Sequence, residues 1–286
     1  MTTIVSRHFA SPGATEEEWA ESLGEDLADD IDKLERRPHA LGRVFNNALL
    51  HLGARCTVDP RAAKLETWEA VVNALQVGSA IFATASATEG TVECRINRQI
   101  RTLPATGEDQ GLTDLGTWLT TFWLAVVCRD QARITELARF PLDRLHGGGF
   151  DEFVRHWVDT LQTYWLQGPG LVEKLTRAVE MSTPGIAVQA PRELLEAVLA
   201  PPINLFYLFI TQNADGFNEA LVQALELHKA YWTADEKRVE SPGGHLALAP
   251  LAIACFAFDG KMPIDVESGY LPHHLLTRGW LGEFPT

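Results

Sequence analysis

The sequence predicts a mainly all-α protein, a multi-helix globular bundle with at most one short extended or β segment near residues 91–96. Two observations carry this prediction. Apolar residues recur at helical spacing along most of the chain, and strict alternation of apolar and polar residues occurs in only one place. The chain has 286 residues, of which 46% are hydrophobic and 22% are charged, a balance typical of a globular protein.

The first three helices are predicted at residues 15–34, 38–52 and 68–82, each with one apolar face. Thr15 and Glu18 have the spacing of a capping box, in which the two side chains satisfy free amides at a helix N-terminus. The second helix begins with a proline, which suits a first helical turn because that turn needs no amide donor.

Residues 91–96 alternate, with Val92, Cys94 and Ile96 on one side, which predicts a short strand or an extended lid. The polar, glycine-containing stretch at 104–114 is the best loop candidate. We therefore expect residues 1–286 to form a single helical domain, or two packed helical subdomains that meet at this loop.

Further helices are predicted from apolar periodicity at residues 118–128, 153–165, 171–181, 192–200, 217–232 and 244–258. Residues 118–128 are apolar on nearly all sides, which is typical of a central helix surrounded by others. Pro201 and Pro202 are expected to end the helix that precedes them, because proline lacks the amide that a continuing helix needs.

Charge excludes two classes of partner. Lys and Arg total 24 against 38 Asp and Glu, a formal net charge of −14. Nucleic acids and anionic membranes are bound by clustered basic residues, and the sequence contains no strongly basic patch. The longest apolar run, residues 246–258, is too short to span a bilayer. We expect no nucleic-acid partner and no membrane partner.

Cysteine usage predicts the compartment. Cys56, Cys94, Cys128 and Cys255 are scattered among apolar neighbours and form no close pair in sequence. Such residues are typical of buried thiols in a reducing environment. The first ten residues lack the apolar core of a secretory signal, so we expect a cytoplasmic protein.

No catalytic or metal-binding motif stands out. None of the nine histidines has a glutamate three residues before it, and the chain lacks H-E-x-x-H, P-loop and G-x-G-x-x-G patterns. His146 precedes three glycines, as in the oxyanion loop of esterases, but no serine stands in the G-x-S-x-G pattern that such a loop needs. We expect no metal and no cofactor, and the balance is against an enzyme.

Two surfaces remain as candidates. One is a small-molecule pocket between aromatic helices, since aromatic side chains with polar tips can orient a ligand. Its candidate residues are Glu66, Glu93, Arg95, His156, Trp157, His228 and Trp232. The other is the acidic face of the first helix. The segment between Ser11 and Arg37 contains ten acidic and three basic residues, so it supplies −7 of the net charge. Such a concentration of negative charge would steer a basic partner protein.

The sequence also resembles a known family, the immunity 49 family of bacterial polymorphic toxin systems, over nearly its whole length. The segments that carry the resemblance are ETWEA at 66–70, EGTVECRI at 89–96, WLTTFWLAVVCR at 118–129, HWVD at 156–159 with YW at 164–165, PPINLFY at 201–207, FNEAL at 217–221, HKAYWTADE at 228–236, PLAIAC at 250–255 and WLGEFPT at 280–286. One position departs from the family pattern, because Gly269 stands where an acidic residue is expected.

The resemblance implies a mostly all-helical cytoplasmic protein that binds and neutralises a cognate bacterial toxin by protein-protein contact, with no reaction. Many toxins attack nucleic acids and are basic, so an acidic inhibitor would complement their charge. The candidate anchors are Asp26, Asp29 and Asp30 on the first helix and the Asp235-Glu236 pair. The alternative is a small-molecule-binding protein or enzyme of a biosynthetic cluster that uses the aromatic pocket.

Overall fold

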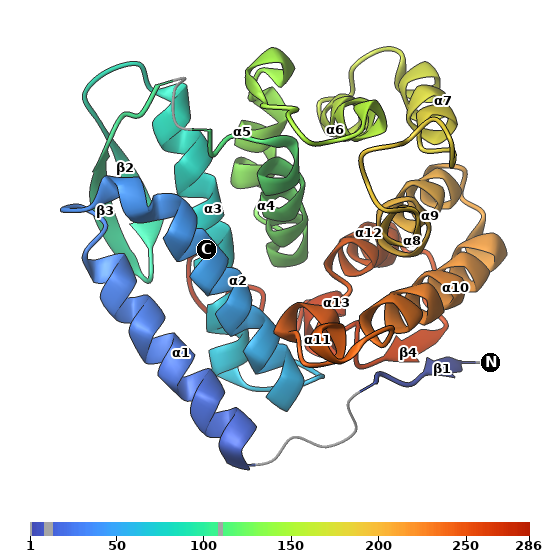
Figure 1. Cartoon of the computed structure of the whole chain (residues 1–286), viewed down its shortest axis with the longest axis horizontal. Coiled ribbons are helices and arrows are strands. Elements are labelled where there is room, and N and C mark those ends of the chain that lie inside the picture. The colour runs from blue at the N-terminus through green and yellow to red at the C-terminus, as the bar shows by residue number, and fades with distance from the viewer. Residues whose placement is uncertain (1, 9–13, 108–110) are drawn as a thin grey trace.

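The structure is a computed structural model that describes residues 2–8, 14–107 and 111–286. Its N-terminal part is a layer of three helices, with α2 (Leu41–Val58) packed against both α1 (Ala14–Asp32) and α3 (Leu65–Ser86) (Figure 1). A short 3-10 turn, Pro38–Ala40, leads into α2. The three helices predicted here are confirmed, and the described part of α1 includes both Thr15 and Glu18 of the predicted capping box.

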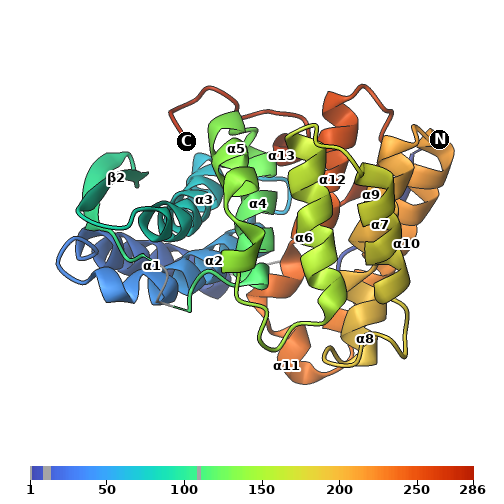
Figure 2. The same cartoon turned by 90° about the horizontal axis from the view of Figure 1, so that it is seen from above.

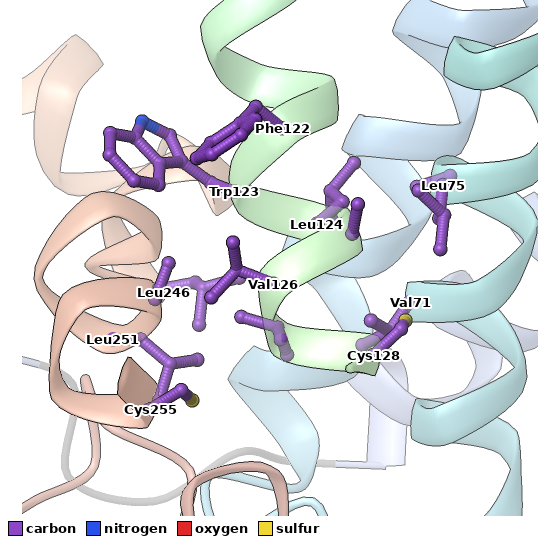
Figure 3. Close-up of a cluster of buried hydrophobic side chains, with 14 of the residues drawn as sticks. Val71, Leu75, Phe122, Trp123, Leu124, Val126, Cys128, Leu246, Leu251 and Cys255 are labelled. Carbon is purple, nitrogen blue, oxygen red and sulfur yellow. The ribbon is translucent and has the colours of Figure 1, made fainter. Parts of the chain in front are cut away.

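Helix α4 (Leu115–Cys128) is the central helix that the sequence predicted. Its second half, from Thr121 to Cys128, is buried throughout, and it packs between α3 and α12 (Leu248–Asp259). Figure 3 shows Leu124 and Cys128 pointing toward Leu75 and Val71 of α3, while Val126 points toward Leu251 of α12. Burial on both sides explains why this helix has no polar face.

The remaining helices form the second part of the molecule (Figure 2). They are α5 (Gln131–Arg139), α6 (Glu152–Trp165), α7 (Leu171–Met181), α8 (Arg192–Leu194), α9 (Pro201–Ile210), α10 (Ala214–Trp232), α11 (Glu236–Val239) and α13 (His273–Leu276). Short 3-10 helices occur at Leu142–Arg144 and Pro242–His245, and a π-helical turn spans Leu195–Leu199. The mainly all-α prediction is confirmed.

Pro201 and Pro202 do not end helical structure, contrary to expectation. They occupy the first positions of α9, where a missing amide costs nothing because those amides have no partner within the helix. The helical path therefore continues from α8 through the π turn into α9. Helices α5 and α9 were not expected from the sequence.

The predicted strand is present and is half of a hairpin. Strand β2 (Thr91–Ile96) pairs antiparallel with β3 (Gln99–Pro104), with Ile96 opposite Gln99. Asn97 and Arg98 form the two-residue turn, and both have positive φ, as a type I′ turn requires. The sequence analysis allowed one extended segment, and the exposed β3 was missed because only its Arg101 and Leu103 side chains face inward.

A second pair of strands joins the ends of the described chain. Strand β1 (Thr3–Val5) pairs parallel with β4 (Val266–Ser268). The Arg7 guanidinium then donates to the carbonyl oxygens of Cys56 (2.9 Å) and Thr57 (2.7 Å), which end α2. These contacts hold the N-terminal segment across the three-helix layer and the C-terminal part.

His8 continues this attachment. Its Nδ1 lies 2.7 Å from the hydroxyl of Tyr270, and its ring stacks on His245 with centroids 4.6 Å apart. The segment at residues 3–8 is therefore fixed by strand pairing, hydrogen bonds and ring stacking together. None of these pairings could be inferred from local sequence pattern.

The predicted boundary loop at 104–114 lies partly outside the described residues, which omit 108–110. One continuous group of buried apolar side chains includes residues from both sides of this loop, among them Phe82 of α3 and Trp118 of α4. The division into one or two subdomains stays a prediction.

Two helical stretches, Arg192–Ile210 and Pro242–Asp259, are long and apolar enough to cross a membrane by length and composition. The second is 61% buried inside the protein, and the core helix of a soluble protein passes the same test. The absence of a membrane partner therefore stays a prediction.

Candidate functional site

The acidic helix α1 divides into acids that are used within the protein and acids that are not. Glu17 accepts from Lys64 (3.0 Å) and from the buried Arg55 (3.2 Å), and the hydrogen bond from Lys64 leads the causes that lower the pKa of Glu17. Asp32 accepts from Arg101 at 2.6 Å. These acids attach α1 to α2, to the start of α3 and to β3.

The three predicted anchors on α1 differ in the same way. Asp30 accepts from Arg43 (2.6 Å) and from Asn47 (3.0 Å), and these contacts, led by the Arg43 hydrogen bond, lower the pKa of the Asp30 carboxyl. Asp29 pairs with Lys33 one turn later. Asp26 is exposed, and the described residues give it no polar partner. Of the three, Asp26 is the most available to a partner protein.

The outer face of α1 carries further acids that are exposed and have no partner in the described part of the chain. With Asp26 they are Glu18, Glu21 and Glu25. Trp19 lies beside them and is 43% exposed. Tryptophan is enriched among the residues that contribute most to protein-protein binding, so Trp19 is a candidate contact residue.

The predicted Asp235-Glu236 anchor lies at the start of α11. Asp235 caps this helix by accepting from the Arg238 amide (3.0 Å), and it also pairs with the Arg238 side chain (3.0 Å). Arg238 in turn pairs with Glu193 and lies over the Tyr231 ring. Asp235 therefore has a local structural role, while Glu236 is exposed.

The structure does not bring the residues of the predicted aromatic pocket together. Helix α9 lies between α6 and α10 (Figures 1 and 2), and it fills the space where the pocket was expected. Trp157 of α6 is buried, and its ring packs edge-on against Phe206 of α9, with centroids 5.2 Å apart. His156, next to it, lies 3.5 Å from Glu152 on the same helix.

On α10, His228 and Trp232 pack against the chain before α12. His228 Nε2 lies 2.9 Å from the Gly244 carbonyl oxygen, and burial lowers the pKa of His228 to about 4. A Cβ at Gly244 would lie 2.9 Å from Cγ of Trp232, so only glycine allows this close approach. Glu66 is remote from all of these residues, exposed in the first turn of α3.

Glu93 and Arg95 do meet at a depression in the surface. A groove of about 450 Å³ lies between β2, α3 and α5. Glu93 and Arg95 line it from β2, and Arg133 and Glu136 line it from α5. Ser79 of α3 also lines the groove. Its volume is within the range of ligand pockets.

Sequence reasoning missed Arg133, Glu136 and Ser79. The spacing of Arg133 and Glu136 places both on one face of a helix, but α5 itself was not predicted. In the sequence, Ser79 cannot be distinguished from the other small residues of the buried helix α3. Its role at the groove depends on where β2 lies, which local pattern does not give.

Two further cavities are apolar. One of about 580 Å³ lies between α7 and α9, where Val172, Val179 and Tyr207 are exposed. Another of about 400 Å³ lies between α4, α6 and the segment at 189–202, and Trp157 lines it. Among the described residues, no group of three or more His, Cys, Asp or Glu side chains could hold a metal ion.

The four cysteines are free and buried. Burial raises the pKa of Cys56 and of Cys255 to about 12, and it also raises the pKa of Cys94 and Cys128. Thiols that stay protonated at neutral pH are weak nucleophiles. The cysteines therefore act as small apolar core residues.

Comparison with known proteins gives one result. A family model described as Immunity protein 49 matches residues 59–275, most of the chain. The chain belongs to the Immunity protein 49 family. No curated protein and no solved structure gives a significant match.

The extent of the family match separates the candidate surfaces of this Immunity protein 49 member. The groove residues on β2, α3 and α5 and the Asp235-Glu236 pair lie within the matched region, whereas α1 with Asp26, Asp29 and Asp30 lies before it. The C-terminal segment 280–286, which contributed to the resemblance, lies after it.

Gly269, the departure from the family pattern, lies within the matched region directly after β4. A Cβ there would lie 2.8 Å from Cδ of Arg7. In this chain the position is therefore occupied by the attachment of the N-terminal segment, and any larger residue would displace Arg7.

Proposed function

We propose that this protein is an immunity protein that binds a basic bacterial toxin and neutralises it by protein-protein contact in the cytoplasm. Membership of the Immunity protein 49 family is the observation that carries this proposal. The net charge of −14 supports a basic partner. The buried free thiols support a reducing compartment, in which they would stay unpaired.

The free acids on α1 provide a physical route to fast binding. Glu18, Glu21, Glu25 and Asp26 are exposed and lack polar partners among the described residues, so their field is not cancelled locally. Such a field raises the rate at which an oppositely charged protein arrives, and salt screens it. A neutralising complex of ordinary size would bury about 800 Å² on each partner.

The first test is co-expression. A candidate toxin domain from the genome that encodes this chain should stop cell growth alone, and growth should be restored when this chain is present. A purified mixture with a catalytically inactive toxin should form a stable complex in size-exclusion chromatography. If growth is not restored and no complex forms, the proposed function is wrong.

A second test addresses the role of α1. The variant Glu18→Gln, Glu21→Gln, Glu25→Gln, Asp26→Asn should reduce the association rate about tenfold at low salt and flatten its salt dependence. A control variant changes the same amount of charge elsewhere, at Glu173, Glu180, Glu196 and Glu219, all exposed. If the two variants associate equally fast with the toxin, α1 does not steer binding.

A further inference from the structure

The direction of the peptide groups in β2 follows from the hairpin turn. In a two-residue hairpin the pair next to the turn, here Ile96 and Gln99, exchanges hydrogen bonds, and the pattern then alternates along the strands. The Ala105 amide donates to the Gly90 carbonyl oxygen (2.9 Å), in agreement with this alternation. The peptide groups of Glu93 and Arg95 therefore point away from β3.

These outward peptide groups are almost without partners. The Arg95 carbonyl oxygen lies 3.5 Å from Nη2 of Arg133, at the outer limit of a hydrogen bond. Within residues 14–107 and 111–286, the structure gives no partner to the Arg95 amide or to either backbone group of Glu93. An unpaired strand edge of this kind is a template for another strand.

The groove described above runs along this open edge. Four consecutive residues of β2, from Val92 to Arg95, line one wall, and α5 provides the opposite wall. Ser79 lines the groove too; its side chain is buried, with the residue only 5% exposed, and its Oγ has no hydrogen-bond partner in the described part of the chain. A buried hydroxyl without a partner is costly, so an incoming polar group would stabilise it.

The charges at the groove indicate the character of the incoming segment. Glu93 and Glu136 are exposed and have no ion pair in the described chain, while Arg133 is already paired with Asp130 (3.1 Å). Arg95 is the one remaining unpaired cation among the described lining residues. The available carboxylates therefore favour a segment that carries Lys or Arg.

We propose that the open edge of β2 binds an extended, basic segment of the partner protein as an added strand, with its side chains in the groove between β2 and α5. Main-chain hydrogen bonds to Glu93 and Arg95 would supply affinity, and the carboxylates of Glu93 and Glu136 would select basic side chains. The identity of this partner as a toxin rests on the proposed function, whereas the strand-addition site rests on the geometry of the hairpin.

Two variants block the site by different means. Glu93→Pro removes an outward amide but leaves the amides that bond to β3, and proline is tolerated on strand edges. Ala83→Trp fills the groove from α3, since Ala83 lines it and is half-buried. Glu66→Trp is the matched control on the same helix, exposed and outside the groove. Circular dichroism and thermal melting verify that each variant is folded.

With the inactive toxin domain as probe, Glu93→Pro and Ala83→Trp should each weaken binding by about tenfold or more, mainly through faster dissociation. Glu93→Gln keeps the amide and loses only charge, so it should weaken binding a few-fold and less at high salt. Glu66→Trp should bind as the wild type does. In the wild-type complex, the amides of Glu93 and Arg95 should become protected from hydrogen exchange.

The outcomes separate this inference from the proposed function. Tight toxin binding with unprotected Glu93 and Arg95 amides would overturn the strand-addition site and leave the immunity function intact. If the toxin does not bind, a capped peptide of alternating Lys and Thr is titrated into the labelled full-length protein. Shifts of the Glu93 and Arg95 amide resonances, lost in Ala83→Trp, would support the site, and their absence would overturn it.

Discussion

The two outer edges of the β2–β3 hairpin have the same backbone chemistry and different surroundings. Along β3, the Thr102 amide donates to a carboxylate oxygen of Glu35 (2.6 Å), just after α1, and the Arg101 side chain pairs with Asp32, so this region occupies part of the β3 edge. Along β2, the corresponding groups of Glu93 and Arg95 face the groove. The β3 edge is thus partly occupied by the protein's own side chains, whereas the β2 edge faces the groove, so we expect strand addition at β2.

The acids near the N-terminus are not equally available to a partner. Charge counting treats all ten acids between Ser11 and Arg37 as one field, but Asp32 and Glu35 are used to cover β3, and Glu17 and Asp30 hold α1 against its neighbours. Only the exposed remainder is available to a partner. The Glu35 carboxylate, just after α1, thus serves as a partner for one outward amide of β3.

The largest expected effect on stability comes from truncating a buried side chain that supports the whole hairpin. Leu103 is 1% exposed beneath the hairpin, and Leu103→Ala should lower the free energy of unfolding by about 2–5 kcal/mol through lost burial and a residual cavity. Ile100→Ala, on the same strand but 53% exposed, should change it by less than about 0.5 kcal/mol. Urea denaturation measures both, and equal losses would mean that the core does not hold the hairpin.

Acid should affect the fold without involving either edge. Burial lowers the pKa of His51 and His228 to about 4 and that of His245 to about 3. The unfolded chain takes up these protons near pH 6.5, before the folded chain does, so stability falls as the pH falls below that value. We expect a loss of about 1–3 kcal/mol between pH 6.5 and 5.5.

Urea denaturation across this pH range measures the loss, and His228→Gln should reduce its slope. The residues that cover β3 and line the groove include no histidine in the described part of the chain. Toxin affinity should therefore change less than stability does. If toxin affinity falls over the same pH range in which the histidines titrate, the buried histidines affect the binding edge as well as the stability of the fold.

The smallest effect contrasts the two edges directly. Glu35→Ala removes the acceptor of the Thr102 amide and should cost about 0.5 kcal/mol of stability, because the bond is exposed to water. Glu93→Ala should leave stability unchanged and weaken toxin binding. Denaturation and binding measurements on both variants test whether Glu35 affects stability and Glu93 affects toxin binding. If Glu35→Ala weakens binding as much as Glu93→Ala does, the partner contacts both edges.

Local periodicity is enough to predict the helical fold, because the spacing of apolar residues in amphipathic helices such as α2, α6 and α10 indicates which face is buried. It is ambiguous where a local signal has two meanings: a pair of prolines can end one helix or begin the next, and Pro201-Pro202 begins α9. It fails for β1 and β4, since each has three residues and the pairing depends on distant chain segments.

The candidate site was predictable only in part. Alternation along β2 correctly set the outward Glu93 and Arg95 apart from the buried Cys94. The opposite wall of the groove comes from α5, which is too short to give a clear periodic signal. The aromatic residues Trp157 and Trp232 were assigned to a pocket because sequence does not reveal that α9 separates their helices.

The pairing of β1 with β4 has a consequence for synthesis. His8 and Tyr270 contact each other across 262 residues of sequence, so this part of the native structure can form only when nearly all of the described chain has been translated. Until then residues 3–8 lack their contacts with β4 and Tyr270, although Arg7 can already bind the end of α2. Contacts of such long range slow folding, so we expect the attachment of the N-terminal segment to be among the last steps of folding.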